Sequence, residues 1–266
     1  MDLIGERNDL IDVILKKNDQ MNYLVCISKT PDTTAKISFK SDDTEYNADG
    51  ISFIMNPYDE WYALVRAIEL SESTGGNVTV INVGPASNDI IIRKALAIGA
   101  NNAVRIDVAS ADAYMTAANI AGYAKDKSFD IIFLGKETID FNGSEVGAMV
   151  AELLELPFIS YASKLEVSDD KFTVTRDIEG GVEICNVEGP FVLSAAKGLA
   201  EQRIPNMKGI MMAKSKPLEV INPIINTPRV IAAKFIIPKA KTGVKLCDPE
   251  NMDELVRLLH EEAKVI

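Results

Sequence analysis

Apolar residues along the chain fall into two patterns that predict alternating strands and helices. Short continuous runs rich in β-branched residues predict buried strands, and apolar residues spaced three or four apart predict amphipathic helices. The predicted strands of the first half are Tyr23–Ser28, Asn77–Val83, Ala103–Ile106 and Asp130–Leu134. The predicted helices are one that follows Asn56-Pro57, then Asp89–Ile98 and Asp112–Lys125. This alternation implies an α/β fold with a mostly parallel sheet that helices cover on both faces.

Turn-forming residues separate these elements. A polar, hairpin-like excursion at residues 36–55 contains the turn signal Asp49-Gly50. Pro57 suits an early helical position because its ring fixes φ near the helical value. Gly75-Gly76 ends the same helix, and Gly99 closes the helix that follows.

The second half of the chain departs from this pattern. Strand-like runs at Lys164–Val167, Lys171–Thr175 and Phe191–Ala195 predict an antiparallel section added to the sheet. From Pro217 onward the chain is extended and punctuated by prolines until a C-terminal helix begins at about Asn251. Such an arm rarely packs only on its own domain, so we expect residues 217–266 to pack on a partner subunit.

The N-terminal residues 1–20 carry loosely spaced apolar residues that predict one short helix. They begin with acidic residues and have no continuous apolar region or small-residue cleavage site, so they do not match a signal peptide. We expect Met21 to be the functional start and residues 1–20 to be an appended or alternative extension. One α/β domain would then cover residues 21–216.

The charge and cysteine content exclude several classes of function. The 266 residues include 28 basic and 39 acidic side chains, and the net charge of −11 argues against a nucleic-acid partner. No stretch approaches the roughly 18–20 uncharged apolar residues of a membrane span. Three widely spaced cysteines argue against a disulfide framework or a zinc site, and they favour a reducing cytoplasm.

Familiar catalytic motifs are absent from the sequence. The single histidine, His260, lies in a segment with the pattern of a C-terminal helix, where we expect it on the helix surface. A Ser-His-Asp triad or a histidine-rich metal site therefore has no histidine to use. No P-loop, dinucleotide fingerprint or nucleophile elbow occurs, so no catalytic or metal-ligating residue is predicted. These observations favour a binding or carrier role over hydrolysis.

Residues 135–157 form the most distinctive local pattern, in which a strand runs into a glycine-containing loop and then a helix. Open α/β sheets bind ligands at the carboxyl ends of strands, and the free N–H groups of a helix N-terminus attract phosphate. Gly135, Gly143 and Gly147 would let the backbone approach a ligand closely. The segment is either a nucleotide site or simply a tight turn.

The segment Lys197–Lys216 is locally basic, with a net charge of +4 in an otherwise acidic chain. It also contains Ile204, Met207, Ile210, Met211 and Met212. Exposed methionines beside cations suit an adaptable docking surface for an acidic partner. The alternative is a solvated loop whose methionines fill a gap in the core.

Ordered blocks across nearly all of residues 21–266 resemble the small (beta) subunit of electron-transfer flavoproteins. The blocks are VCISKTPDT at 25–33, MNPYDEWYALVRAIEL at 55–70, INVGP at 81–85, RKALAIGA at 93–100, LGKETID at 134–140, ASKLEV at 162–167, VTRDIEGGVE at 174–183, GIMMAKSKP at 209–217 and KTGVKL at 241–246. The VTRDIEGGVE block, with GPFVLS after it, is the most specific of them.

This resemblance implies a fold, cofactors and partners. The fold would be the three-layer α/β/α arrangement of the adenine-nucleotide hydrolase-like group, in a heterodimer with a large (alpha) subunit. The alpha subunit would hold most of an FAD, and this chain would bind a structural AMP, or a second FAD in its place if the protein is flavin-bifurcating. Electrons would come from acyl-CoA dehydrogenases or similar flavoenzymes, so the chain would be a carrier subunit without catalytic residues.

The resemblance also assigns site residues by position. Contacts to the base and ribose would come from two strand ends and a turn, at Cys26, Val83, Asn56, Pro57, Tyr58 and Asp59. The phosphate cradle would be Asp140, Phe141, Asn142, Gly143, Ser144, Glu145, Val146, Gly147, Ala148 and Met149. Most relatives carry glutamine at the position of Glu145, where an ionised carboxylate would repel phosphate, so we expect this side chain to turn outward.

Partner docking would centre on Met207, with Arg203 and Ile210 beside it. Two other functions remain as alternatives at this point. A stand-alone nucleotide-binding or stress-type protein would need neither the C-terminal arm nor the VTRDIEGGVE block. An adenine-nucleotide hydrolase would need a general base or a phosphate-binding motif, and neither is visible in the sequence.

Overall fold

The computed structural model describes residues 20–168, 171–240 and 243–266. The predicted helix within residues 1–20 lies outside the described residues, apart from Gln20. The described residues divide into two units, one within 20–36 and 48–231 and the other within 37–47 and 232–266. The domain division expected from the sequence stays a prediction.

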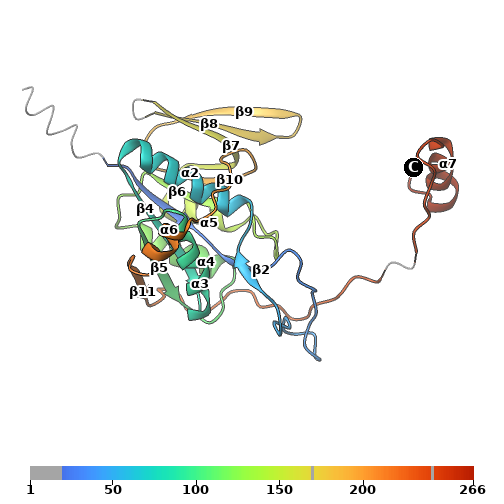
Figure 1. Ribbon diagram of the computed structural model, residues 1–266, viewed down its shortest axis with the longest axis horizontal. Coiled ribbons are helices and arrows are strands. Elements are labelled where there is room, and N and C mark those ends of the chain that lie inside the picture. The colour runs from blue at the N-terminus through green and yellow to red at the C-terminus, as the bar shows by residue number, and fades with distance from the viewer. Residues whose placement is uncertain (1–19, 169–170, 241–242) are drawn as a thin grey trace, which may run out of the picture. The chain divides into compact units, whose positions relative to one another are not determined.

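A nine-stranded sheet forms the centre of the first unit (Figure 1). Its strands lie in the order β11-β5-β4-β1-β6-β10-β7-β8-β9. Their bounds are Asn22–Cys26 for β1, Asn77–Gly84 for β4, Asn102–Asp107 for β5, Ile131–Gly135 for β6, Phe158–Ser168 for β7, Lys171–Ile178 for β8, Gly181–Val187 for β9, Phe191–Ala195 for β10 and Leu218–Ile221 for β11. Neighbours from β11 to β7 pair in parallel, and only β7-β8 and β8-β9 are antiparallel. The prediction of a mostly parallel sheet with an antiparallel addition is therefore confirmed.

The strand Phe191–Ala195 corrects one prediction. Its sequence pattern predicted a strand of the antiparallel section, but β10 pairs in parallel with β6 on one side and with β7 on the other. After the β8-β9 hairpin the chain returns to the middle of the sheet. All five residues of β10 are buried, which is what an interior parallel strand requires because both of its faces are covered.

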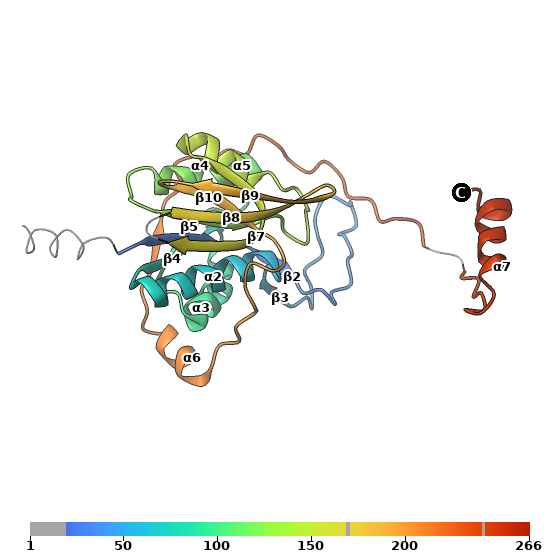
Figure 2. The same cartoon turned by 90° about the horizontal axis from the view of Figure 1, so that it is seen from above.

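Helices cover both faces of the sheet, so the predicted three-layer arrangement is confirmed (Figure 2). One face carries α2 (Asp59–Thr74) and α3 (Asp89–Ile98), and the other carries α4 (Ala113–Ala124) and α5 (Val146–Leu154). Successive strand residues pack into the hydrophobic cores on opposite faces of the sheet. In β10, Phe191 and Leu193 pack toward α2, and Val192 packs toward α5.

Several element boundaries differ from those expected. The first long helix begins at Asp59 with Tyr58 at its N-cap, so Pro57 lies before the helix rather than in its first turn. Leu218–Ile221, expected within the extended arm, form β11 at the edge of the sheet. A short helix, α6, covers Met207–Ala213.

The predicted excursion at residues 36–55 is hairpin-like. Its base is the two-stranded antiparallel pair of β2 (Lys29–Pro31) and β3 (Phe53–Met55). Within the second unit, Phe39 and Tyr46 pair as an antiparallel bridge, and the ring of Phe235 stacks on Phe39 with centroids 4.7 Å apart. The excursion therefore holds a segment of the C-terminal arm within that unit.

The C-terminal helix is present as α7 (Met252–Arg257), which continues as a π-helical turn, η2 (Leu258–Ala263). His260 is exposed there, as expected. None of the helices in the described ranges is long and apolar enough to cross a membrane. Within the same ranges no three His, Cys, Asp or Glu side chains form a group that could hold a metal ion.

Asn119 fixes the chain that returns along α4 after β11. This fully buried side chain donates to the carbonyls of Met115 and Ile225 at 2.8 Å each. Its Oδ1 atom accepts the backbone N–H groups of Ile224 at 2.8 Å and Ile225 at 3.3 Å. One side chain therefore satisfies several backbone groups of an irregular segment.

Replacing Asn119 with leucine should destabilise the fold by about 2 kcal/mol or more, because backbone groups would be left buried without partners. The measurement is the urea midpoint of the purified protein. Asn222→Leu, an exposed position in the same return segment, is the matched control and should change the midpoint little. Equal effects of the two substitutions would contradict this role of Asn119.

Candidate functional site

The predicted ligand-binding residues gather at one edge of the sheet, where three neighbouring parallel strands end. These are β4, β1 and β6, which end at Gly84, Cys26 and Gly135. The next helix after β1 is α2 and the next after β6 is α5, and these two pack on opposite faces of the sheet. Open α/β sheets bind ligands at such a switch point, outside the carboxyl ends of the strands. We use the word crevice for this region, which comprises the ends of β4, β1 and β6, the turn at residues 56–58 and the loop between β6 and α5.

Asn56 joins the two sides of this crevice. Its side chain is fully buried, donates to the Glu137 carbonyl at 3.0 Å and accepts the Ile139 N–H at 3.0 Å. Its own N–H donates to the Ser28 carbonyl at 2.9 Å. The turn before α2 is therefore bound to the loop after β6, and Asn56 acts on the loop through the loop's backbone.

The loop between β6 and α5 holds an uncommon backbone conformation. Asn142 and Ser144 have φ values of 49° and 52°, in the left-handed region that residues other than glycine seldom adopt. The N–H of Asn142 donates to the Thr138 carbonyl at 2.9 Å, and the Ser144 hydroxyl donates to the Glu137 carboxylate at 3.3 Å. Across the crevice Tyr58 has a φ of 63°. Strained residues of this kind cluster where a loop must present its backbone to a ligand.

The N-terminus of α5 offers N–H groups to an anion. The first N–H that bonds within the turn is that of Met149, to the Glu145 carbonyl at 3.2 Å, so Val146, Gly147 and Ala148 have no carbonyl of the helix to donate to. A Cβ at Gly147 would lie 3.0 Å from the Phe158 ring, so glycine lets the helix approach β7 closely. The helix dipole adds positive potential at this end.

Glu145 and Phe141, both in the loop between β6 and α5, are exposed. The Oε1 atom of Glu145 would lie 3.1 Å from a Cβ built on Gly143, so its carboxylate lies beside the loop backbone. The Asp140 carboxylate accepts the N–H of Phe141 at 2.9 Å. The outward orientation of Glu145 in the presence of a bound phosphate stays a prediction.

Cys26 and Val83 lie on the adjacent strands β1 and β4, on the core face that α4 and α5 cover. Cys26 is 6% exposed, and burial raises the pKa of its thiol, which therefore stays protonated. A neutral, buried thiol is a poor nucleophile, so Cys26 can only line the floor of the crevice.

The predicted docking residues are not part of this crevice. Met207 and Ile210 belong to α6, which lies on the outer side of α3, and Arg203 precedes it (Figure 2). The side chains of Met207, Met211 and Met212 are 73%, 69% and 50% exposed. These methionines do not fill a core gap, which removes that alternative for the segment.

Comparisons with known proteins decide the family. A sequence model described as the electron transfer flavoprotein domain matches residues 44–225. The "Electron transfer flavoprotein subunit beta" of Bacillus subtilis is 36% identical over 260 residues, covering 92% of this chain and all of the relative. The chain belongs to the electron transfer flavoprotein beta-subunit family. The human protein of the same name is 32% identical over 257 residues, which cover 92% of this chain and 99% of the relative. The protein of that name from Thermoanaerobacterium thermosaccharolyticum is 38% identical over 199 residues, covering 74% and 76%.

Glu60 is a buried residue beside the candidate site, and the sequence pattern did not single it out. Its carboxylate accepts the N–H of Ser28 at 2.7 Å and the Ser28 hydroxyl at 2.5 Å. A Cβ at Gly135 would lie 2.8 Å from its Cγ, so the end of β6 packs directly on this side chain. Burial raises the pKa of Glu60 to about 8, although the Ser28 hydrogen bonds oppose the shift. The sequence did contain a signal for this position. Glu60 precedes Leu64 and Ile68 by one and two helical turns, so its carboxylate falls on the apolar face of α2.

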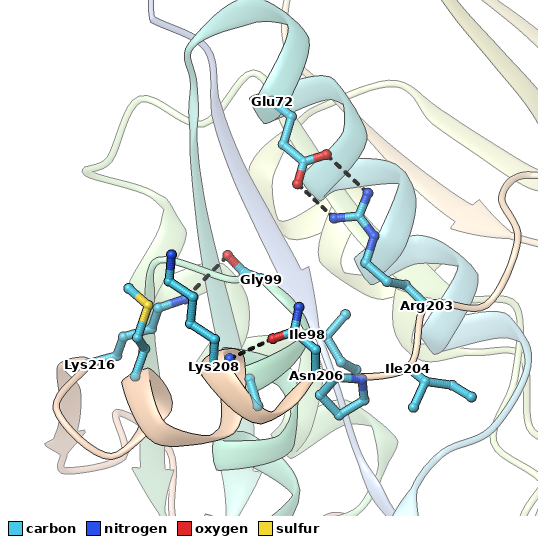
Figure 3. Close-up of a pocket in the computed structure, with 12 residues that line it drawn as sticks. Glu72, Ile98, Gly99, Arg203, Ile204, Asn206, Lys208 and Lys216 are labelled. Atoms are coloured by element: carbon cyan, nitrogen blue, oxygen red, sulfur yellow. Dashed lines mark hydrogen bonds and ion pairs between the residues drawn. The ribbon is translucent and has the colours of Figure 1, made fainter.

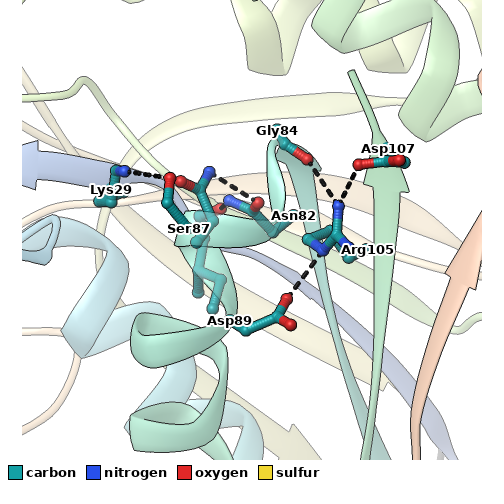
Figure 4. A network of polar contacts seen from close by, with 9 residues as sticks. Lys29, Asn82, Gly84, Ser87, Asp89, Arg105 and Asp107 are labelled. Carbon is teal, nitrogen blue, oxygen red and sulfur yellow. Dashed lines mark hydrogen bonds and ion pairs between the residues drawn. The ribbon is translucent and has the colours of Figure 1, made fainter. Parts of the chain in front are cut away.

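A polar network that no sequence motif indicated holds the ends of β4 and β5 (Figure 4). Asn82 donates to the Ile27 carbonyl at 2.8 Å and accepts from Asn88 at 3.0 Å, which fixes the start of α3 to β1. Arg105 binds Asp89 at 2.8 Å, the Gly84 carbonyl at 3.1 Å, and Asp107. Two of its nitrogens are thus engaged within the fold and the residue is 4% exposed, so Arg105 supports the strand ends rather than binding a phosphate.

Glu60→Gln should remove a pH-dependent loss of stability. The folded-state pKa of Glu60 is raised, so its stabilising contribution is complete below its unfolded pKa near 4.5 and is lost as the pH rises through about 8. Glutamine keeps an acceptor for the Ser28 N–H and a donor for the Ser28 hydroxyl without that titration. Between about pH 5 and about pH 9 the stability of the variant relative to wild type should grow by more than about 1.4 kcal/mol, the value of one pKa unit.

Thermal unfolding of both proteins across this pH range measures the effect. Glu152→Gln, an exposed residue of α5, makes the same change of side chain without burial and serves as the control. Parallel pH profiles for Glu60→Gln and wild type would show that Glu60 does not titrate in this range.

Proposed function

We propose that the chain is the beta subunit of a heterodimeric electron-transfer flavoprotein and binds AMP at the carboxyl edge of its sheet. The observation that carries the proposal is the loop after β6, which Asn56 holds in place and which leads directly into the free N–H groups of α5. That arrangement fits a nucleotide phosphate because backbone donors and a helix dipole converge on it. Family membership supplies the alpha subunit as the partner.

The residues around the crevice fit such a nucleotide. Val146, Gly147 and Ala148 would donate N–H groups to the phosphate, and the exposed Tyr58 would cover the opposite side. Cys26 and Val83 would lie under the base. The fold would position the nucleotide here, and no side chain at the site has to supply a reacting group.

The electron-carrying group would be an FAD held mostly by the alpha subunit. The flavin supplies the redox chemistry when it is bound, and the protein sets its position and surroundings. On this proposal the chain is a carrier subunit and not a catalyst, which agrees with a protonated Cys26 thiol. The electron donor would be an acyl-CoA dehydrogenase or a similar flavoenzyme.

Co-expression with the alpha subunit, followed by an absorbance spectrum and chromatography of released nucleotides, tests the proposal. One FAD and one AMP per heterodimer would support the simple carrier. Two FAD would indicate a flavin-bifurcating protein with the second FAD in the same crevice. Failure to associate with an alpha subunit would overturn both.

Asn56→Ala should lower the affinity for the nucleotide about tenfold, because the loop after β6 loses two hydrogen bonds that fix it relative to β1. The measurement is AMP content after purification and AMP titration of the stripped heterodimer. Asn222→Ala, at an exposed position away from the crevice, should retain full AMP content. Unchanged AMP binding by Asn56→Ala would contradict the placement of the site.

Met207→Ala should slow reduction of the heterodimer by an acyl-CoA dehydrogenase about tenfold, since an exposed apolar anchor is the kind of residue that dominates docking energy. Bound nucleotide should be unaffected, because α6 lies outside the crevice. Stopped-flow reduction with the dehydrogenase as donor measures the rate. Leu153→Ala removes an exposed apolar side chain from α5, on the opposite face of the sheet, and should leave the rate unchanged.

A further inference from the structure

Two cations hold α6 and α3 together, because each binds the free carbonyls at the C-terminal end of one of the two helices. Arg93 of α3 donates to the carbonyls of Ala213 at 2.8 Å and Lys216 at 2.7 Å, at the C-terminal end of α6. Lys216 in turn donates to the carbonyls of Leu96 at 2.9 Å and Ala100 at 2.5 Å, at the C-terminal end of α3. The last carbonyls of a helix have no partner within it and carry the negative end of the dipole. A side chain of α3 therefore caps α6, and a side chain three residues after α6 caps α3.

The chain that enters α6 is fixed just as closely (Figure 3). Arg203 binds Glu72 of α2 through two hydrogen bonds of 2.7 and 3.0 Å, and its carbonyl accepts the Trp61 indole N–H at 3.2 Å. Asn206 caps α6 by accepting the N–H of Gly209 at 2.8 Å. A Cβ at Gly209 would lie 2.3 Å from the Ala97 carbonyl, so the two helix backbones touch.

These contacts divide the cations of the basic segment Lys197–Lys216. Arg203 is neutralised by Glu72, and the ammonium group of Lys216 is directed at backbone carbonyls. Burial lowers the pKa of Lys216, but its carbonyl partners favour the ammonium form. Lys208 and Lys214 are exposed, and across the described ranges neither forms an ion pair. Fewer positive charges of the segment are therefore free to contact a partner than its net charge of +4 suggests.

Apolar side chains are exposed along the same helix, which carries Lys208 and has Lys214 at its C-cap. Met207, Met211 and Ile210 are exposed along α6, and a groove between α6 and α3 continues this surface. Its lining is Ile90, Arg93, Lys94, Ala97, Pro205, Ile210, Ala213 and Lys214. An apolar strip with free cations at its rim is complementary to an apolar pocket bordered by carboxylates.

We propose that four cations on and beside α6 have two separate roles in docking an acidic flavoenzyme. Lys216 and Arg93 are positioning residues that keep α6 preformed on α3, whereas Lys208 and Lys214 steer the partner toward it. A preformed helix avoids the cost of ordering side chains and backbone when the partner binds. Free surface charges act mainly on the rate of encounter, which salt suppresses. The inference rests on the docking role assigned to Met207 under the proposed function.

Lys216→Met and Lys214→Met distinguish the two roles, because they remove the same charge from positions two residues apart. Both are made in the full heterodimer with the alpha subunit. Hydrogen exchange of the α6 amides reports the position of the helix without any dehydrogenase. Reduction by an acyl-CoA dehydrogenase, measured at low and at high ionic strength, reports docking.

Lys216→Met should accelerate exchange in α6 about tenfold, because the helix loses its attachment to α3. It should slow reduction by a similar factor at low and at high salt, mainly by raising the KM for the heterodimer. Lys214→Met should leave exchange unchanged and slow reduction about threefold at low salt only. Lys216→Arg keeps a cation with several donors and should restore most of the wild-type rate, and nucleotide content should stay constant throughout.

The proposal is overturned if Lys216→Met leaves exchange in α6 unchanged, or if its slowing of reduction disappears at high salt as that of Lys214→Met should. It is also overturned if the slowing caused by Lys214→Met persists at high salt. If no dehydrogenase reduces the wild-type heterodimer, the proposed function itself fails. The exchange result then still decides whether Lys216 positions α6.

Discussion

The buried amide of Asn56 is the contact on which the candidate site depends. The strands β1 and β6 are adjacent, yet the segments that follow them leave toward opposite faces of the sheet, so nothing in the sheet itself fixes one segment relative to the other. Asn56 supplies both a donor and an acceptor to the backbone of the loop after β6. A carboxylate or an apolar side chain of similar size offers only one of these or neither. The positive φ angles of Asn142 and Ser144 are tolerable only because the loop is held at such points.

The sequence predicted the elements of the sheet well and their order less well. Runs such as Asn77–Val83 are apolar because both faces of a parallel strand are covered, and that requirement is local enough to read from the chain. The place of Phe191–Ala195 between β6 and β7 is set by which strand edges remain open, and a local pattern carries no information about that. The same applies to Leu218–Ile221, which looks extended in either setting and becomes β11 because β5 has a free edge.

The region of the candidate site could be predicted from the sequence, but the buried charged residues that support it could not. The residues proposed for the crevice, from Cys26 to Met149, were named because a strand, a glycine loop and a helix make a recognisable junction and because the family resemblance assigned them by position. Their contact with a nucleotide stays a prediction. Glu60 and Arg105 were missed because the sequence places charged residues on the surface by default. Their structural role follows from their partners. Glu60 binds Ser28, and Arg105 binds the Gly84 carbonyl and two carboxylates. These pairings join residues that are far apart along the chain, or they involve backbone atoms. Composition and periodicity carry no information about either kind of contact.

The helix α3 connects the carboxyl edge of the sheet to the segment Lys197–Lys216, which is proposed above as the docking surface. Its first residue, Asp89, is held by Arg105 at the carboxyl edge of the sheet, and its last turn is capped by Lys216. The distance and orientation between the two regions are therefore set by one rigid element that is fastened at both ends. Rigidity of this kind gives fixed geometry between a bound cofactor and a docked partner, but it does not by itself couple them, because coupling needs an element with two arrangements. A subunit that binds a structural nucleotide at one region and a partner at the other, as proposed above, needs the fixed geometry and not the switch.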